Sequence, residues 1–303
     1  MKKLLLFLSI FLVVSLACDL AVTIAQPTSP ATMPANTIVP AEATSTQVPA
    51  VDTSVPPTAA PTEALPSSNG TDVFYGQIGL TLPSGLASGI SGSQVERADG
   101  EDVPQWGRTP GHTEIALEGY LLQGKFHQAR IYIYPAMDYA MLNPGAFESM
   151  HRLNNFLYDP SQVSNEQLPQ VPFFNAGQVF ASNVQLIQFQ NGQGVRFLTE
   201  YAQYFAPVNN HELFYHFQGL TSDGEYYVIA ILPITVQVLA ESSDPGAPLP
   251  SGGIPYPDIT NPDADWAGYY NAVSALLNGT SSEAFVPTLT KLDQLIQSMQ
   301  VNP

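Results

Sequence analysis

The sequence predicts an α+β fold, in which an antiparallel sheet that includes a four-stranded β-meander packs helices on one face. Two turn sequences, Asn191-Gly192 and Ser222-Asp223-Gly224, separate segments of alternating apolar residues. Near the end of the chain, apolar residues recur at helical spacing over 283–299. An aromatic-rich, periodic composition begins at Asp72, which predicts a single globular domain over residues 72–303.

The first strands are expected before residue 135. Residues 73–83 are typical of one strand, and 114–122 with 126–134 are typical of an antiparallel pair that reverses at Gln123-Gly124. In the last segment, one face is expected to carry Ala129, Ile131 and Ile133, and the other Arg130, Tyr132 and Tyr134.

A helix is expected after these strands. Asn143-Pro144 is typical of a helix start, because Asn caps free backbone N–H groups and Pro fits the first turn. The helix should run to about Leu157, before Asp159-Pro160.

The meander is the clearest local pattern. Its four strands are expected over 184–190, 195–205, 213–220 and 226–232. In the second strand, Val195, Phe197, Thr199, Tyr201 and Phe205 share one face, and Arg196, Glu200 and Tyr204 share the other. We expect one face to be core and the other to be partly exposed.

Two helices should close the domain after a Pro/Gly/Ser loop over 242–257. Asn261-Pro262 should cap the first, which ends near Asn278-Gly279, and the second should span about 283–299. The ending Leu292–Met299 loosely resembles the last helix of PsbP-like α+β sandwiches. That likeness covers only the end of the domain and carries no motif, so it implies no site residues.

The N-terminus is typical of an export signal. Lys2 and Lys3 precede an apolar run over 4–17, and Cys18 follows directly. The segment Ser15-Leu16-Ala17-Cys18 resembles the lipobox of bacterial lipoproteins, although Ser15 stands where Leu is commonest. The resemblance implies cleavage after Ala17, so that residues 1–17 are a signal peptide, and lipid attachment through acyl chains such as palmitate at Cys18.

An uncleaved anchor over 4–25 is the alternative, and it would place Asp19 inside hydrocarbon at a cost of a few kcal/mol. Residues 18–71 are expected to be the lipidated Cys18 and a disordered stalk, because Pro, Thr, Ala and Ser dominate and no aromatic residue occurs over 27–69. The expected location is extracytoplasmic, with the chain held by lipid on the outer face of the cell membrane.

Charge excludes one class of partner. The net charge is −17, and nine Lys and Arg residues form no cluster, whereas nucleic-acid binding needs a basic patch. A single Cys also excludes an internal disulfide and any multi-cysteine metal site.

Metal and cofactor sites are not expected. His211-Glu212 and His216 do not match the zinc-protease motif, because the histidines are five apart and point to opposite faces of a strand. Asp258, Asp263 and Asp265 lack further oxygen ligands for Ca²⁺, and the latter two are expected in the first turn of a helix.

No catalytic residue can be named. The chain has no Gly-x-Ser-x-Gly, Ser-x-x-Lys or Walker sequence, and the glycines at 85–92 lie in a stretch expected to be irregular. Tyr132, Tyr134 and Tyr204 are candidates to stack on a glycan or to contact a partner protein from an exposed sheet face.

The expected function is therefore a lipid-anchored, stalked, non-enzymatic module for binding or assembly. An extracytoplasmic hydrolase that uses unidentified carboxylates remains the alternative, because paired acids are not excluded. A passive spacer of the cell envelope is the third interpretation.

Overall fold

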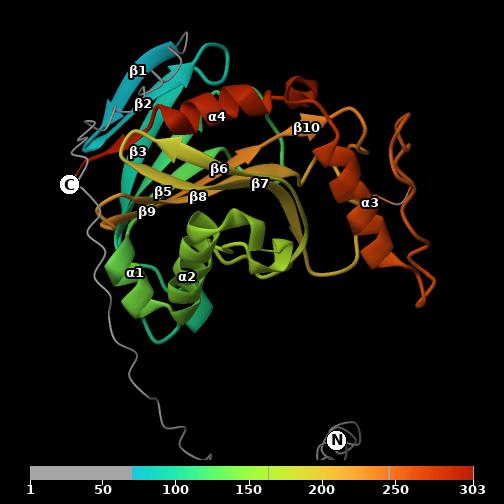
Figure 1. Cartoon of the computed structure of the whole chain (residues 1–303), viewed down its shortest axis with the longest axis horizontal. Coiled ribbons are helices and arrows are strands. Elements are labelled where there is room, and N and C mark those ends of the chain that lie inside the picture. The colour runs from blue at the N-terminus through green and yellow to red at the C-terminus, as the bar shows by residue number, and fades with distance from the viewer. Residues whose placement is uncertain (1–69, 163, 245, 303) are drawn as a thin grey trace, which may run out of the picture. The chain divides into compact units, whose positions relative to one another are not determined.

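The centre of the computed structural model, which describes residues 70–162, 164–244 and 246–302, is a seven-stranded antiparallel sheet. Its strand order is β3-β4-β5-β9-β8-β7-β6 (Figure 1). In chain order the strands are β3 (Gly89–Val95), β4 (His112–Glu118), β5 (Arg130–Pro135), β6 (Gly177–Phe189), β7 (Gly192–Ala202), β8 (Phe214–Thr221) and β9 (Tyr226–Pro233). Consecutive pairing of β6 to β9 confirms the predicted meander.

Two smaller sheets complete the strands. One is formed by β1 (Gly70–Tyr75), β2 (Ile78–Pro83) and β12 (Gln300–Val301). The other pairs β10 (Thr235–Val236) with β11 (Phe285–Val286).

Helices lie on both faces of the large sheet (Figure 1). They are α1 (Ala136–Leu142), α2 (Pro144–Tyr158), α3 (Trp266–Asn278) and α4 (Leu289–Gln297). One core joins the sheet to α3, α4 and the β1–β2 hairpin, and a second core joins the opposite face to α1 and α2. The predicted α+β class is confirmed, but the expected placement of helices on one face does not hold.

The reason is visible in β8, where both alternating sets of side chains are apolar. Tyr215 and Phe217 enter the first core, and Phe214 enters the second. A strand that is apolar on both sides needs cover on both sides. A strand of this kind therefore requires a packed layer on each face of the sheet.

The N-terminal strands differ from the expectation. Residues 73–83 are not one strand, because the chain reverses at Gly76, whose φ of 55° suits glycine. The stretch expected to be irregular forms β3, and Gly92 there faces the ring of Tyr75, where a Cβ would lie 2.3 Å from a ring carbon. The antiparallel pair β4–β5 and the alternation around Ile131 are confirmed.

The second meander strand was expected to have a partly exposed face, which is wrong. Arg196 and Glu200 are buried, because α4 and the loop after β7 cover them. Tyr204 lies beyond the strand, which ends at Ala202.

The helix ends are set by polar caps. Asn143 caps α2 as predicted, since its Oδ1 accepts from the N–H groups of Gly145 and Ala146. The helix α3 begins later than expected, at Trp266, and Asp265 is its cap, so Asp263 and Asp265 do not lie in its first turn. Likewise, α4 begins after Thr288, because Phe285–Val286 pairs with β10 instead of joining the helix.

The signal peptide, Cys18 and the stalk up to residue 69 lie outside the described residues. Within the described ranges, no helix combines the length and apolar character that a membrane span requires.

Candidate functional site

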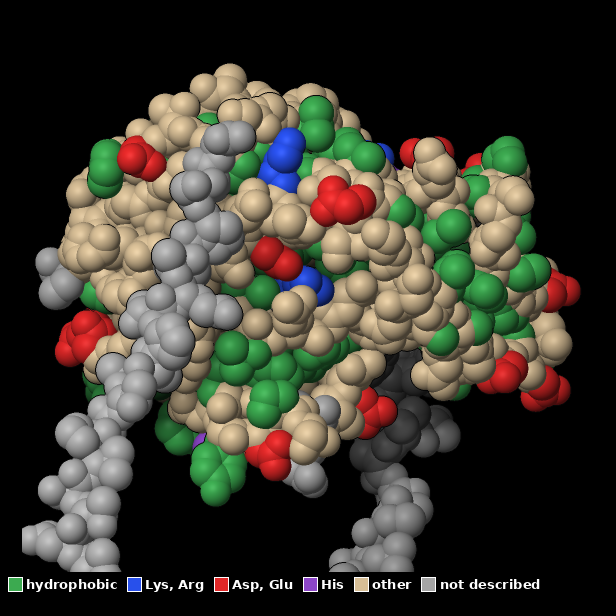
Figure 2. All heavy atoms as spheres, turned by 45° about the horizontal axis from the view of Figure 1, so that its top comes forward, with side chains coloured by type: hydrophobic (Ala, Val, Ile, Leu, Met, Phe, Trp, Pro, Cys, Tyr) green, Lys and Arg blue, Asp and Glu red, His purple; other side chains and the backbone are tan. Residues whose placement is uncertain are grey.

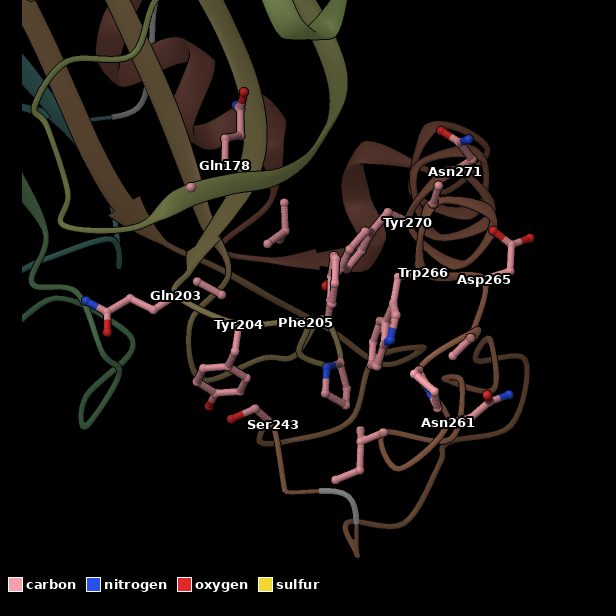
Figure 3. Close-up of a pocket in the computed structure, with 18 of the residues that line it drawn as sticks. Gln178, Gln203, Tyr204, Phe205, Ser243, Asn261, Asp265, Trp266, Tyr270 and Asn271 are labelled. Carbon is pink, nitrogen blue, oxygen red and sulfur yellow. The ribbon is translucent and has the colours of Figure 1, made fainter. Parts of the chain in front are cut away.

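A cleft of about 1370 Å³ opens at the end of the molecule where α3 packs near the first residues of β6 (Figure 3). We call it the aromatic cleft. Its walls are formed mainly by the start of β6, the loop that follows β7, and residues 259–271, which include the first turns of α3; Glu166 and Ser243 complete the lining. The lining residues used below are Glu166, Gln178, Gln203, Tyr204, Phe205, Ser243, Asn261, Asp265, Trp266, Tyr270 and Asn271.

Stacked rings form one wall of the aromatic cleft. Phe205 is 65% exposed, and its ring lies nearly parallel to that of Trp266, with centroids 5.6 Å apart and an interplanar angle of 11°. Trp266 is buried and contacts Tyr269 and Tyr270 on α3. Phe205 therefore has one face packed on Trp266 and a large exposed area, beside Tyr204, which is 67% exposed (Figure 3).

The loop that carries Phe205 is held by α3. The Tyr270 hydroxyl donates to Ala206 O and accepts from Ala206 N–H, both at 3.1 Å. The Tyr269 hydroxyl accepts from Val208 N–H at 3.0 Å. These bonds satisfy buried backbone groups next to Phe205, so the aromatic wall is preorganised.

A buried acid holds the same loop from the sheet side. Glu200 is 0% exposed, and its Oε2 accepts from Asn209 N–H at 3.0 Å. Burial raises the pKa of Glu200 well above its ordinary value, and the neighbouring Glu212 adds to that shift, against the effect of the Asn209 N–H. Glu200 does not line the aromatic cleft, so it supports the wall without contacting its contents.

The polar lining of the cleft is made of amides and acids. Gln178, Gln203, Asn261 and Asn271 supply side-chain amides, and Glu166 and Asp265 are the lining acids. The described lining contains no Lys, Arg or His. On the face drawn in Figure 2, hydrophobic and acidic side chains gather on the lobe that contains α3, and few Lys or Arg side chains are visible.

The structure separates the three predicted tyrosines. Tyr132 and Tyr134 lie together on β5, with ring centroids 6.3 Å apart, but Tyr134 is only 3% exposed and belongs to the second core. Tyr204 lies in the aromatic cleft. Sequence reasoning assigned Phe205 to a strand face and gave Trp266 no site role, because neither residue belongs to a motif and their stacking is a tertiary contact.

The described histidines and acids that could be metal ligands do not converge. Burial lowers the pKa of His216 to about 3, and its Nε2 lies 2.9 Å from Val171 O. Asp258 accepts from the backbone N–H and hydroxyl of Thr260, which lowers its pKa. Among the described residues, no group of three His, Cys, Asp or Glu side chains is placed to hold a metal ion.

A second groove, of about 640 Å³, lies between α1, α2 and the β8–β9 turn. Its apolar lining includes Met137, Phe147 and Met150, and Asp223 lies at the turn. Phe147 and Met137 are exposed there. It contains fewer polar side chains than the aromatic cleft and no stacked aromatic wall.

Comparison of the chain with protein-family models, with curated proteins and with solved structures finds no match in any of the three.

Proposed function

We propose that this protein is a lipid-anchored extracytoplasmic binding module, and that the aromatic cleft is its ligand site. The observation that carries the proposal is the exposed pair Tyr204 and Phe205 in a large cleft whose wall is hydrogen-bonded in place. Ligand sites are typically concave and apolar with a few placed polar groups, which is the composition of this cleft. The anchor is inferred from the lipobox-like segment ending at Cys18.

Binding is favoured over hydrolysis by the state of the acids. The neighbouring acids Glu200 and Glu212 both accept hydrogen bonds from Asn209 Nδ2, and neither acid lines the cleft. Asp265 does line the cleft, but its Oδ1 accepts from Gly268 N–H at 2.8 Å as the cap of α3. No described observation favours a catalytic role for these groups, so the hydrolase interpretation gains no support.

A ligand screen tests the binding site. Thermal unfolding of the full-length chain is measured with oligosaccharides, peptidoglycan fragments, divalent metal ions and small metabolites. We expect saturable stabilisation by one class, because a ligand that binds only the folded state raises the unfolding temperature. Phe205→Ala should reduce that shift, and Phe74→Ala should retain it, since Phe74 is also an exposed aromatic residue but lies on β1 outside the cleft.

Two outcomes would contradict the binding site. One is the absence of stabilisation by every class. The other is a stabilisation that Phe205→Ala leaves unchanged, which would place the ligand elsewhere.

Metabolic labelling with a fatty-acid analogue tests the anchor. The wild-type chain should incorporate label, and Cys18→Ala should not, because Cys18 is the only cysteine in the sequence. Unlabelled wild-type chain would reject the lipoprotein assignment and leave the cleft proposal untouched.

A further inference from the structure

The ligand class follows from three features of the described lining of the aromatic cleft. These are its exposed aromatic rings, its side-chain amides with unused hydrogen-bonding groups, and its lack of cationic side chains. We infer that the cleft binds an uncharged oligosaccharide, with sugar rings packed on Phe205 and Tyr204 and hydroxyl groups hydrogen-bonded to the lining amides. This inference depends on the proposed function, because it names the ligand of the same site.

The ring surface suits the apolar face of a sugar. Phe205 is fixed by its contact with Trp266 and remains 65% exposed. A pyranose ring presents a face of C–H groups, and these carry partial positive charge toward the negative face of an aromatic ring. Tryptophan is the aromatic side chain that binds cations most strongly through its ring face. Phe205 covers a ring face of Trp266, so that face is not open to a quaternary ammonium ligand.

Three amides are oriented by the protein and keep part of their hydrogen-bonding capacity. Gln178 Nε2 lies 3.2 Å from Thr199 Oγ1, and Gln203 Nε2 donates to Asn175 O at 2.6 Å. Asn261 Oδ1 accepts from Asp263 N–H at 3.0 Å. Within the described ranges, no partner is present for the carbonyl oxygens of Gln178 and Gln203 or for the amide nitrogen of Asn261.

Such amides match the chemistry of hydroxyl groups. A sugar hydroxyl both donates and accepts, and the two carbonyl oxygens and one NH₂ group supply acceptors and a donor at the rim of the cleft, where Figure 3 shows the ends of Gln178 and Gln203 directed away from Phe205. Ser243 and Asn271 add side chains that make no hydrogen bond to any described residue. Preorganised polar groups lose little conformational entropy on binding, so they favour one ligand orientation.

The charge of the lining excludes acidic sugars. Glu166 and Asp265 line the cleft, and no cationic side chain is present in the described lining to pair with a uronate, sulfate or phosphate. A buried or partly buried anion without a partner is costly, and two like charges add to that cost. The cleft volume of about 1370 Å³ exceeds the ~300–1,000 Å³ typical of small-molecule pockets, which favours an oligomer over a monosaccharide.

The test measures binding of three hexasaccharides to the full-length chain: cellohexaose and N-acetylchitohexaose as neutral probes, and hexagalacturonate as the acidic probe. Isothermal titration gives affinity. The chain has two tryptophans, Trp106 and Trp266. In the Trp106→Phe variant, tryptophan fluorescence therefore comes from Trp266 alone and reports on binding in the cleft.

We expect saturable binding of at least one neutral hexasaccharide, a change in Trp266 emission, and no binding of hexagalacturonate. Phe205→Ala should weaken the neutral ligand by about tenfold, as loss of one aromatic stacking contact predicts. Gln178→Ala should weaken it less, by roughly threefold to tenfold, as expected for one hydrogen bond. The control Phe74→Ala should leave the affinity unchanged.

A proline-rich peptide is the comparison ligand, because aromatic grooves also bind polyproline II segments. If the peptide binds in a Phe205-dependent way and neither neutral sugar binds, the sugar assignment is overturned and the cleft remains a ligand site. Equal binding of hexagalacturonate also overturns it. If no probe binds in a Phe205-dependent way, both the sugar assignment and the proposed binding site are rejected.

Discussion

Glu200 and Asn209 join the central sheet to the loop that carries the aromatic wall. Glu200 Oε2 accepts from the Asn209 backbone N–H at 3.0 Å, and Glu200 Oε1 accepts from Asn209 Nδ2 at 3.2 Å. Asn209 Oδ1 in turn accepts from the N–H groups of His211 and Glu212. A single buried carboxyl group thereby organises the backbone at 209–212, in the same connection between β7 and β8 that carries Phe205.

Glu200 should make the folded state less stable as pH rises. Burial raises its folded pKa well above the ordinary value of 4.5, so folding is linked to proton uptake at this carboxyl. The stability that this group contributes is complete below the ordinary value and is lost as pH rises through the folded pKa. Glu200→Gln should remove that loss, which urea unfolding between about pH 4 and about pH 9 will measure.

The matched control for Glu200 is Glu96→Gln, which changes an exposed acid and should retain the wild-type pH profile. A Glu200→Gln profile that follows the wild type over the whole range would show that Glu200 does not take up a proton on folding.

His216 should destabilise the protein in acid. Burial lowers its pKa from 6.5 to about 3. Between these two pH values the imidazole is protonated in the unfolded chain and neutral in the folded chain. Stability should therefore fall as pH decreases from about 6.5 toward about 3. His216→Gln removes this group, and it should flatten the acid limb of the urea-unfolding profile, whereas His151→Gln on the exposed side of α2 should not. An unchanged acid limb in His216→Gln would assign acid sensitivity to other groups.

Arg196 and Asp293 fasten α4 to the sheet. Arg196 is 3% exposed; its Nε donates to Asp293 Oδ1 at 3.1 Å and its Nη2 to Oδ2 at 2.9 Å. Asp293→Ala leaves this buried cation without its carboxylate, and we expect a loss of about 3–5 kcal/mol in the free energy of unfolding. Denaturant titration measures the loss.

Two further variants test this explanation. The exposed change Asp263→Ala should have little effect. The double variant Arg196→Met/Asp293→Leu should recover much of the lost stability, because an apolar pair carries no unpaired charge. If the double variant is as unstable as Asp293→Ala, packing at α4 rather than the ion pair accounts for the effect.

Asn143 combines a helix cap with a tertiary contact. Its Oδ1 caps α2, and its Nδ2 donates to Trp106 O at 3.1 Å and to Arg108 O at 3.0 Å. Asn143→Ala should cost about 1–2 kcal/mol, near the upper end for a cap, since the tertiary acceptors also lose their donor. Asn143→Asp keeps the cap but not the donor, and it should lie between the wild type and Asn143→Ala in thermal unfolding. Asn154→Ala, on the exposed side of α2, is the control.

Local sequence rules predicted the elements whose determinants are local. Asn143-Pro144 predicted the start of α2, and the turns at Asn191-Gly192 and Ser222-Asp223-Gly224 predicted the meander. These rules failed where distant residues decide the structure. The β3 strand forms because Gly89–Val95 pairs with β4, although its Ser and Gly residues have low strand propensity. Phe285–Val286 leaves the predicted helix because it pairs with β10.

The sequence by itself determined the α+β class, the meander and the capped helix α2, because alternation, turn residues and caps act within short windows. Tertiary structure alone decided that both sheet faces are covered, that Tyr134 is buried, and that Phe205 stacks on Trp266 beside Tyr204. Stacking and burial depend on side chains brought together from distant segments, and a one-dimensional pattern carries no measure of that proximity. The candidate cleft is for this reason a property of the fold.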